Sequence, residues 1–327
     1  MLKKGFLLTG ILCILVLEGF SQVFIQNTLY PYNRFVYNPA AAGTADGTQL
    51  ALMGRLQWLG IDGGPRLVTA SINTPLETLQ SGVGVHFVLD ELGPLSTTGA
   101  NASYAYHFQL RPGDVSSPRI SIGAAAGILQ KRIDGTRFLY DQSGGIDPVV
   151  PTSNNSVIVP NLSAGIYLTL PDDKLFVGLS GQDLLEPSLE ELLGTSSIGD
   201  DSKVSRSFYL MGGYRFDLPG RDITIQPTFM GRAEGGLSSF QFDLSTYVHI
   251  KSLITLGVSH RFYNDSFSGM AGFRITENTF LGYAFDYTVS DLNANGDLSS
   301  HEIFLSYTFR TAKRTKGPLD NVIKKPR

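Results

Sequence analysis

The sequence has one cysteine, one tryptophan and no long apolar run beyond its N-terminal segment. Cys13 lies in that segment, so the rest of the chain supports neither a disulfide framework nor a cysteine-ligated metal. A membrane-spanning helix needs about 20 apolar residues, and no later stretch is of this kind. The formal net charge is −3, which gives no general attraction to nucleic acid. We therefore expect no disulfide-rich domain, no helical membrane protein and no nucleic-acid partner.

Residues 1–21 have the parts of a secretory signal peptide. Met1–Lys4 is short and basic, and Gly5–Leu17 is apolar but too short to span a bilayer as a helix. Gly19-Phe20-Ser21 then offers small residues before a cut at Gln22. We expect the mature chain to be exported and to contain no cysteine.

The chain does contain many short segments in which apolar and polar residues alternate. Between residues 242 and 250, one face is apolar and the other polar: Phe242, Leu244, Val248 and Ile250 against Asp243, Ser245 and His249. This period of two predicts β-strands. The mean hydropathy is close to zero, as in membrane barrels, where only every second residue faces lipid.

Counting these segments predicts roughly fourteen strands. They are expected near Leu50–Leu59, Arg66–Asn73, Gly82–Asp90, Thr98–Leu110, Arg119–Arg132, Asn161–Leu170, Leu175–Leu184, Arg206–Phe216, Ile223–Arg232, Phe240–Ile250, Leu253–Phe262, Ser268–Ile275, Phe280–Ser290 and His301–Phe309. The fold class is therefore all-β: a transmembrane antiparallel up-and-down β-barrel over residues 49–309. An even number of strands leaves both ends of the barrel chain on the same side of the membrane.

The lengths of the connections suggest an orientation. Tight connections follow even-numbered strands: Pro171–Lys174, Lys251-Ser252 and Thr276–Asn278. Long connections follow odd-numbered strands: Ile133–Pro160, Leu185–Ser205 and Asp291–Ser300. Outer-membrane barrels have short periplasmic turns and longer outer loops, so both termini are expected in the periplasm.

Two segments flank the barrel. Residues 22–48 are expected to form an N-terminal periplasmic segment or a plug. Barrels of about 8 strands are filled and those of 16–18 strands are open, so the sequence leaves open whether the lumen is plugged. Residues 310–327 are basic and poor in apolar residues, and are expected to be a periplasmic tail, either solvated or used as a docking peptide.

Residues 291–302 match the calcium-loop pattern D-x-[DN]-x-[DN]-G-x5-E. Asp291, Asn293, Asn295 and Glu302 would supply oxygen ligands around the turn at Gly296. That pattern normally lies between helices, whereas strands are expected here, and Asn-Gly is also a hairpin signal. A calcium site and an acidic hairpin tip are the two interpretations, and no other cofactor is expected.

Charged residues on the inward faces of late strands form a second group: Arg261, Arg274, Asp286 and Glu302, with Arg55 on the first strand. Closure makes the first and last strands neighbours. This group is interpreted either as a lumen that binds a passenger or plug, or as a charge ladder that satisfies the interior.

No residue pattern indicates an enzyme. The histidines show no metal-ligand spacing, and no nucleophile elbow or phosphate loop is present. Ser259 and His260 are adjacent on a strand and so point to opposite faces. The chain is expected to be non-enzymatic.

Several motifs resemble those of the PorP/SprF family. They are Asn38-Pro39-Ala40-Ala41-Ala42-Gly43, Arg55-x-Gln57-Trp58-x-Gly60-x-Asp62-Gly63-x-Pro65, Ser71-x-Asn73-Thr74-Pro75-Leu76, Tyr283-x-Phe285-Asp286-Tyr287 and Ser300-His301-Glu302-Ile303-x-Leu305-Ser306-Tyr307-x-Phe309. The chain departs from the family in its alanine triplet, where an aromatic is usual, and in its basic tail.

This resemblance implies an integral outer-membrane barrel of the type IX secretion and gliding apparatus of Bacteroidota. Some members belong to the core apparatus, linked to periplasmic components, and others support export of a large adhesin and hold its C-terminal domain at the cell surface. The expected function is secretion and surface anchoring of an adhesin or cargo C-terminal domain, with that domain, periplasmic type IX components and outer-membrane lipid as partners. The alternative is a channel for small hydrophobic or polar substrates.

Overall fold

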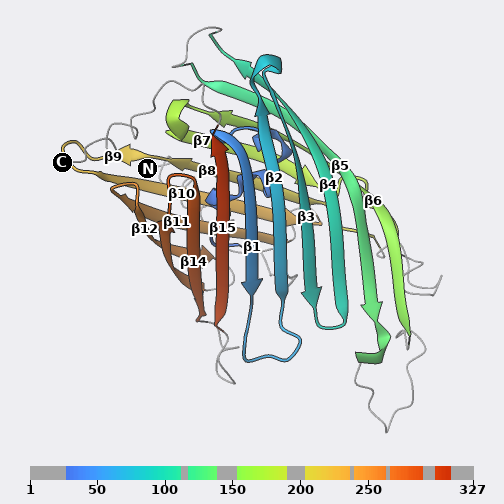
Figure 1. Ribbon diagram of the computed structural model, residues 1–327. Coiled ribbons are helices and arrows are strands. Elements are labelled where there is room, and N and C mark those ends of the chain that lie inside the picture. The colour runs from blue at the N-terminus through green and yellow to red at the C-terminus, as the bar shows by residue number, and fades with distance from the viewer. Residues whose placement is uncertain are drawn as a thin grey trace, which may run out of the picture.

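The computed structural model describes residues 27–111, 117–137, 153–189, 203–235, 239–262, 266–289 and 299–310. Antiparallel strands follow one another around a single sheet (Figure 1). They are β1 (Gly47–Leu56), β2 (Arg66–Leu76), β3 (Ser81–Leu92), β4 (Leu95–Gln109), β5 (Arg119–Asp134), β6 (Asn154–Thr169), β7 (Leu175–Gln182), β8 (Ser207–Tyr214), β9 (Phe216–Asp217), β10 (Ile223–Glu234), β11 (Ser239–Ile250), β12 (Ile254–Phe262), β13 (Ser266–Arg274), β14 (Thr279–Thr288) and β15 (Ser300–Arg310).

The sheet closes into a barrel. β10 pairs with β11, and β15 pairs with β1. β8 and β9 both pair with β10 and are separated by Arg215, so they form one strand of the wall. The wall therefore has fourteen antiparallel strands, which confirms the predicted fold class and strand number.

Short helical turns complete the described elements. Three lie before β1: η2 (Tyr30–Tyr32), α2 (Arg34–Tyr37) and η3 (Pro39–Ala41). The others lie in connections: η4 (Glu77–Leu79), η5 (Gly135–Arg137) and η6 (Pro171–Asp173). None of the described helices is long and apolar enough to cross a membrane.

We call the end of the barrel at which β1 begins and β15 finishes the terminal end, and the opposite end the loop end. The expected connection Ile133–Pro160 lies at the loop end and is shorter than predicted, because β5 runs to Asp134 and β6 starts at Asn154. The sequence interpretation began this strand only after Pro160, at Asn161. Proline is tolerated where a strand lacks a partner on one side, and β7 pairs with β6 only between Ala164 and Thr169.

The alternation of short and long connections is also less strict than predicted. Only Gly93 and Pro94 join β3 to β4, although this connection lies at the loop end. Gly93 has a φ of +55°, which glycine adopts without strain. Connection length therefore indicates an end of the barrel only on average.

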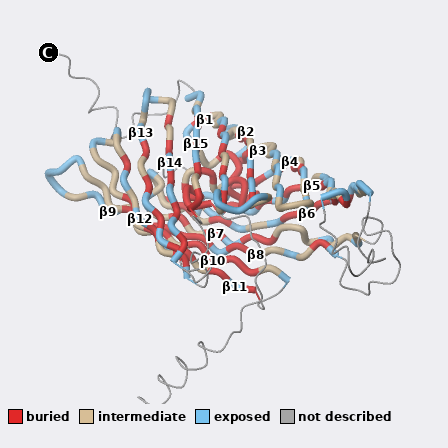
Figure 2. The backbone as a smooth tube through the Cα atoms, turned by 90° about the horizontal axis from the view of Figure 1, so that it is seen from below, coloured by how far each residue is buried: buried red, intermediate tan, exposed pale blue. Residues whose placement is uncertain are grey.

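The two faces of the wall differ as the period of two predicts. In β1, Leu50, Leu52 and Leu56 point outward and are exposed, whereas Met53 and Arg55 are buried. Figure 2 shows the same division around the ring, with buried residues also in the segment that the wall encloses. An apolar outer face and a polar inner face suit a barrel solvated by lipid.

Candidate functional site

Residues 27–43 run through the inside of the barrel, and we call them the lumenal segment (Figure 1). Most of its side chains are buried, including Asn27, Tyr37 and Ala40. The segment begins beside β14 and β15 and leaves at the terminal end, where Gly47 starts β1. It covers part of the 22–48 range that the sequence analysis set apart from the barrel.

The first residues of the lumenal segment are held by two carboxylates of the wall. The backbone N–H groups of Thr28 and Leu29 each donate to one oxygen of Glu302, both at 2.8 Å. The hydroxyl of Thr28 donates to Asp286 at 2.9 Å. The hydroxyl of Tyr247 donates to the carbonyl oxygen of Thr28 at 2.8 Å. The two carboxylates thus bind the same short stretch, Glu302 through its main chain and Asp286 through the side chain of Thr28.

These carboxylates belong to a chain of buried ion pairs that crosses neighbouring strands. Asp286 lies 2.6 Å from Arg55, and Arg55 lies 3.2 Å from Glu302. On the other side, Arg261 lies 3.5 Å from Asp286 and 3.1 Å from Asp243. Asp243 also pairs with Arg232. Arg261 also donates to the hydroxyl of Ser266, its cross-strand neighbour on β13, at 3.5 Å.

The ion-pair chain is balanced in charge and almost dry. It contains three arginines and three carboxylates, each no more than 3% exposed. Removing such charges from water costs several kcal/mol per ion, which only good pairing and further hydrogen bonds offset. Besides its ion pair with Arg55, Glu302 accepts hydrogen bonds from backbone N–H groups of the lumenal segment. The wall carboxylate and these buried N–H groups therefore satisfy each other's hydrogen-bonding capacity.

Aromatic contacts hold the middle of the lumenal segment. Tyr32 stacks on Phe280 with ring centroids 4.5 Å apart. The hydroxyl of Tyr30 and that of Thr228 are 2.9 Å apart. These rings fill the interior.

Arg34 ties the segment to the terminal end. Its guanidinium donates to Asp173 in the β6–β7 turn and to the hydroxyl of Tyr167, both at 2.7 Å. It also lies over the ring of Phe176, 4.1 Å from the centroid. Unlike the deeper ion pairs, this one is partly exposed, with side-chain exposures of 20% for Arg34 and 35% for Asp173.

The last part of the segment, Asn38–Gly43, is held by close fit and neutral hydrogen bonds. The side-chain amide of Asn38 donates to the carbonyl oxygen of Ile166 at 3.0 Å, and its oxygen accepts from the N–H of Ala40 at 2.9 Å. Gly123 faces Ala40 so closely that a Cβ on it would lie 2.5 Å from the Ala40 Cα. Glycine at 123 therefore lets the wall approach the main chain of the segment.

The structure brings four of the five predicted lumen residues together. Arg55, Arg261, Asp286 and Glu302 all belong to the ion-pair chain. Arg274 does not: it lies at the terminal end and donates to the carbonyl oxygens of Ser252 and Glu277. The alternation of polar and apolar residues predicts that Arg274 faces inward, but it does not predict how far along the barrel axis the residue lies.

The predicted calcium ligands Asp291, Asn293 and Asn295 lie outside the described residues, so this site stays a prediction. The fourth, Glu302, would have to bind the ion with its carboxylate. Both of its oxygens instead accept from Thr28 and Leu29 inside the barrel. Within the described part of the chain, no group of three or more His, Cys, Asp and Glu side chains could hold a metal ion.

The sequence analysis did not select Arg232 and Asp243 as site residues. The cross-strand register carries the missing signal. Asp243 lies directly opposite Met230 on β10 and Arg261 on β12, and Arg232 is two residues from Met230 on the same face of β10. The sequence held no comparable signal for the contacts of Thr28 and Leu29, because these residues lie outside the strands and no register links them to Glu302.

Several solved structures are similar to this chain. The toluene transporter TbuX of Ralstonia pickettii aligns with a TM-score of 0.50 and 11% identity, over 90% of this chain and 99% of that chain. The toluene transporter TodX of Pseudomonas putida gives 0.48 and 11%, over 90% and 99%. The outer membrane protein Omp33 of Acinetobacter baumannii gives 0.44 and 11%, over 80% and 98%. The search of curated proteins found no match.

A family model described as type IX secretion system membrane protein PorP/SprF matches residues 20–307. The closed barrel and this match identify an integral protein of the outer membrane. The match spans nearly the whole sequence, including the lumenal segment and every strand of the wall up to β15. The chain therefore belongs to the PorP/SprF family of type IX secretion system membrane proteins.

Proposed function

We propose that this protein is a non-enzymatic outer-membrane component of type IX secretion that supports export of a large adhesin or cargo protein and holds its C-terminal domain at the cell surface. Family membership implies interaction with components of the secretion machinery. The proposal takes the terminal end as periplasmic and the loop end as external, in line with the usual arrangement of turns and loops in such barrels.

The observation that carries the proposal is the filled lumen. The lumenal segment is bound to the wall at its start by Glu302, near its middle by Asp173 and near its end by the carbonyl oxygen of Ile166. A filled lumen favours an anchor over an open pore. The closed barrel would stay in the membrane while the connections at one end bind a folded domain.

The binding surface proposed for the passenger lies on the two largest loop-end connections, residues 135–153 and 183–206. To test it, residues 138–150 and 190–200 are replaced separately by short Gly/Ser linkers in the host. Surface adhesin is then measured with antibody on intact cells. We expect either replacement to reduce surface adhesin while the barrel remains in the outer membrane.

A matched control replaces residues 112–116, which connect β4 and β5 at the terminal end. This change should leave surface adhesin at the wild-type level. Retention of full surface adhesin in both loop-end variants would contradict the anchoring role.

The competing function is a channel for small substrates, and the similar barrel TbuX is a toluene transporter. Planar-bilayer recording of the purified protein separates the two. Anchoring predicts no steady conductance from the wild-type protein, whereas a steady open pore would favour transport.

A further inference from the structure

Four charged side chains lie inside the barrel near the loop end, apart from the ion-pair chain: Asp90 on β3, Lys131 on β5, Asp183 directly after β7 and Glu234 on β10. Asp90 and Lys131 belong to one cross-strand row, with Thr97 of β4 between them. β3 and β10 lie on opposite sides of the ring (Figure 2). Lys131 nevertheless acts electrostatically on all three carboxylates, so the four groups share one space. We call these four residues the acidic mouth.

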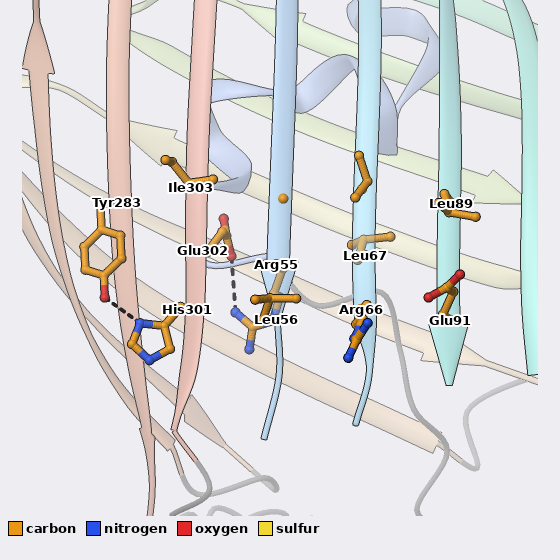
Figure 3. Close-up of a pocket in the computed structure, with 12 residues that line it drawn as sticks. Arg55, Leu56, Arg66, Leu67, Leu89, Glu91, Tyr283, His301, Glu302 and Ile303 are labelled. Atoms are coloured by element: carbon orange, nitrogen blue, oxygen red, sulfur yellow. Dashed lines mark hydrogen bonds and ion pairs between the residues drawn. The ribbon is translucent and has the colours of Figure 1, made fainter. Parts of the chain in front are cut away.

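The acidic mouth is unbalanced in charge, unlike the ion-pair chain, in which Arg55 pairs with Glu302 (Figure 3). It holds three carboxylates and one ammonium group, an excess of two negative charges. Among the described residues, no ion pair joins any of the four to a partner. All four are partly buried. Charges withdrawn from water need close partners, and the described part of the chain does not supply the missing cation.

A second observation, one layer deeper in the lumen, also points to a ligand. Asn161 on β6 is 7% exposed, and its side-chain nitrogen donates to the side-chain oxygen of Asn101 at 3.0 Å. Gly127 separates the two in the register and leaves room for this bond, because a Cβ there would lie 2.5 Å from the Asn101 oxygen. The side-chain oxygen of Asn161 has no hydrogen-bond partner within the described part of the chain.

The free oxygen of Asn161 lies beside the acidic mouth. Leu162, the next residue of β6, accepts from the N–H of Leu184 at 2.9 Å, and Leu184 directly follows Asp183. Asp183 and Asn161 are therefore close neighbours. A buried acceptor without a donor is costly, as are the unpaired carboxylates next to it. A ligand that carries both a positive charge and several N–H donors would remove both costs.

We propose that the acidic mouth binds the ammonium group of a lysine from the passenger's C-terminal domain, an inference that rests on the proposed function. An ammonium group has three N–H donors on a flexible four-carbon stem. It can therefore enter from the loop end, pair with the carboxylates and donate to the oxygen of Asn161. The position also fits, because Asp183 opens one of the two connections proposed to bind the passenger, and Lys131 lies on the strand that leads into the other.

The test is carbodiimide cross-linking of intact host cells, followed by purification of this protein and mass spectrometry of its peptides. The reagent joins a carboxylate to an amine in direct contact, with loss of one water. We expect peptides in which Asp90, Asp183 or Glu234 is joined to a lysine of the adhesin. The triple variant Asp90→Asn, Asp183→Asn, Glu234→Gln should lack them. Adhesin should leave washed cells of this variant about tenfold faster, because charge-assisted hydrogen bonds are strong and interface mutations act mainly on dissociation.

Glu91→Gln is the matched control, because Glu91 follows Asp90 on β3 but is exposed on the outer face (Figure 3). It should keep the cross-links and hold adhesin as the wild type does. Absence of the cross-links in the wild type would overturn the proposal, as would cross-links only to amines of this chain. A triple variant that holds adhesin at the wild-type rate would do the same. If the loop-end replacements described above release adhesin while the triple variant does not, the lysine site is wrong and the anchoring role stands.

Discussion

The two ends of the lumenal segment are held by different physical means. Its start, at Thr28 and Leu29, depends on the carboxylates of Glu302 and Asp286, within a buried chain of ion pairs. Its end, at Asn38 and Ala40, depends on neutral hydrogen bonds and close approach to wall glycines. The first should respond mainly to changes in charge, and the second mainly to changes in volume.

Glu302→Gln should have the largest effect. The amide keeps the shape of the side chain but leaves Arg55 without its second carboxylate and presents N–H donors to the N–H groups of Thr28 or Leu29. Removing one partner of a buried ion pair costs about 3–5 kcal/mol. We expect a loss of this size in the free energy of unfolding, measured by denaturant titration in detergent.

Glu91→Gln is the control, because Glu91 is an exposed carboxylate on the outer face. It should change stability by no more than about 0.5 kcal/mol. An equal loss in the free energy of unfolding for Glu302→Gln and Glu91→Gln would contradict the stabilising role of the buried carboxylate.

Gly123→Ala tests the other end by volume alone. The added Cβ would lie 2.5 Å from the backbone of Ala40, which cannot move aside as a flexible side chain does. Overpacking costs about 1–3 kcal/mol, so the unfolding midpoint should fall. Gly269→Ala, whose Cβ meets nothing within 4 Å, should unfold like the wild type. Equal midpoints for the two variants would contradict a close fit at Ala40.

Asp173→Asn removes a charge at the terminal end, where Arg34 is its partner. Since both side chains are partly exposed, solvent screens the pair, and exposed ion pairs contribute about 1 kcal/mol or less. The loss should therefore be clearly smaller than that of Glu302→Gln and should shrink in high salt. A loss as large as that of Glu302→Gln would remove the distinction between buried and exposed contacts.

Asp183→Asn should act in the opposite direction and stabilise the protein. Asp183 follows β7 at the loop end, with a φ of +56° that asparagine tolerates well. Burial raises the pKa of Asp183 to about 6, so the folded state holds its proton more tightly than the unfolded state. The wild type therefore gains stability as the pH falls through 6, and the charged carboxylate is unfavourable above it.

The variant should accordingly be more stable than the wild type by about 1–3 kcal/mol at pH 7, since one pKa unit corresponds to about 1.4 kcal/mol. This advantage should shrink as the pH falls from 6 toward 4, near the ordinary pKa of an aspartate. An advantage that does not change with pH would mean that the backbone conformation, rather than the carboxylate, causes it.

The sequence predicted the wall better than the interior. Period-two alternation fixes which face a residue occupies, and closure makes β1 and β15 neighbours, so the pattern placed Arg55 and Glu302 on adjacent strands of the inner face, where the structure pairs them. Alternation does not fix height, and Arg274 therefore lies at the terminal end despite its inward face.

The path of the lumenal segment could not be predicted in the same way. It has no strand period, and its contacts join residues far apart in the chain, as between Thr28 and Glu302. The alanine triplet, which departs from the family pattern, is explained only by the structure: Ala40 and Ala42 are fully buried against the wall, next to Gly123 and Gly82.

The central claim is that the chain's own N-terminal residues occupy the lumen. The most direct test is the labelling of single-cysteine variants of the folded protein with a bulky, water-soluble maleimide. Ala41 is 2% exposed inside the barrel, whereas Leu79, in the turn after β2, is 61% exposed. Ala41→Cys should react only after unfolding, while Leu79→Cys should react at once. Equally fast labelling of both in the folded protein would contradict the account.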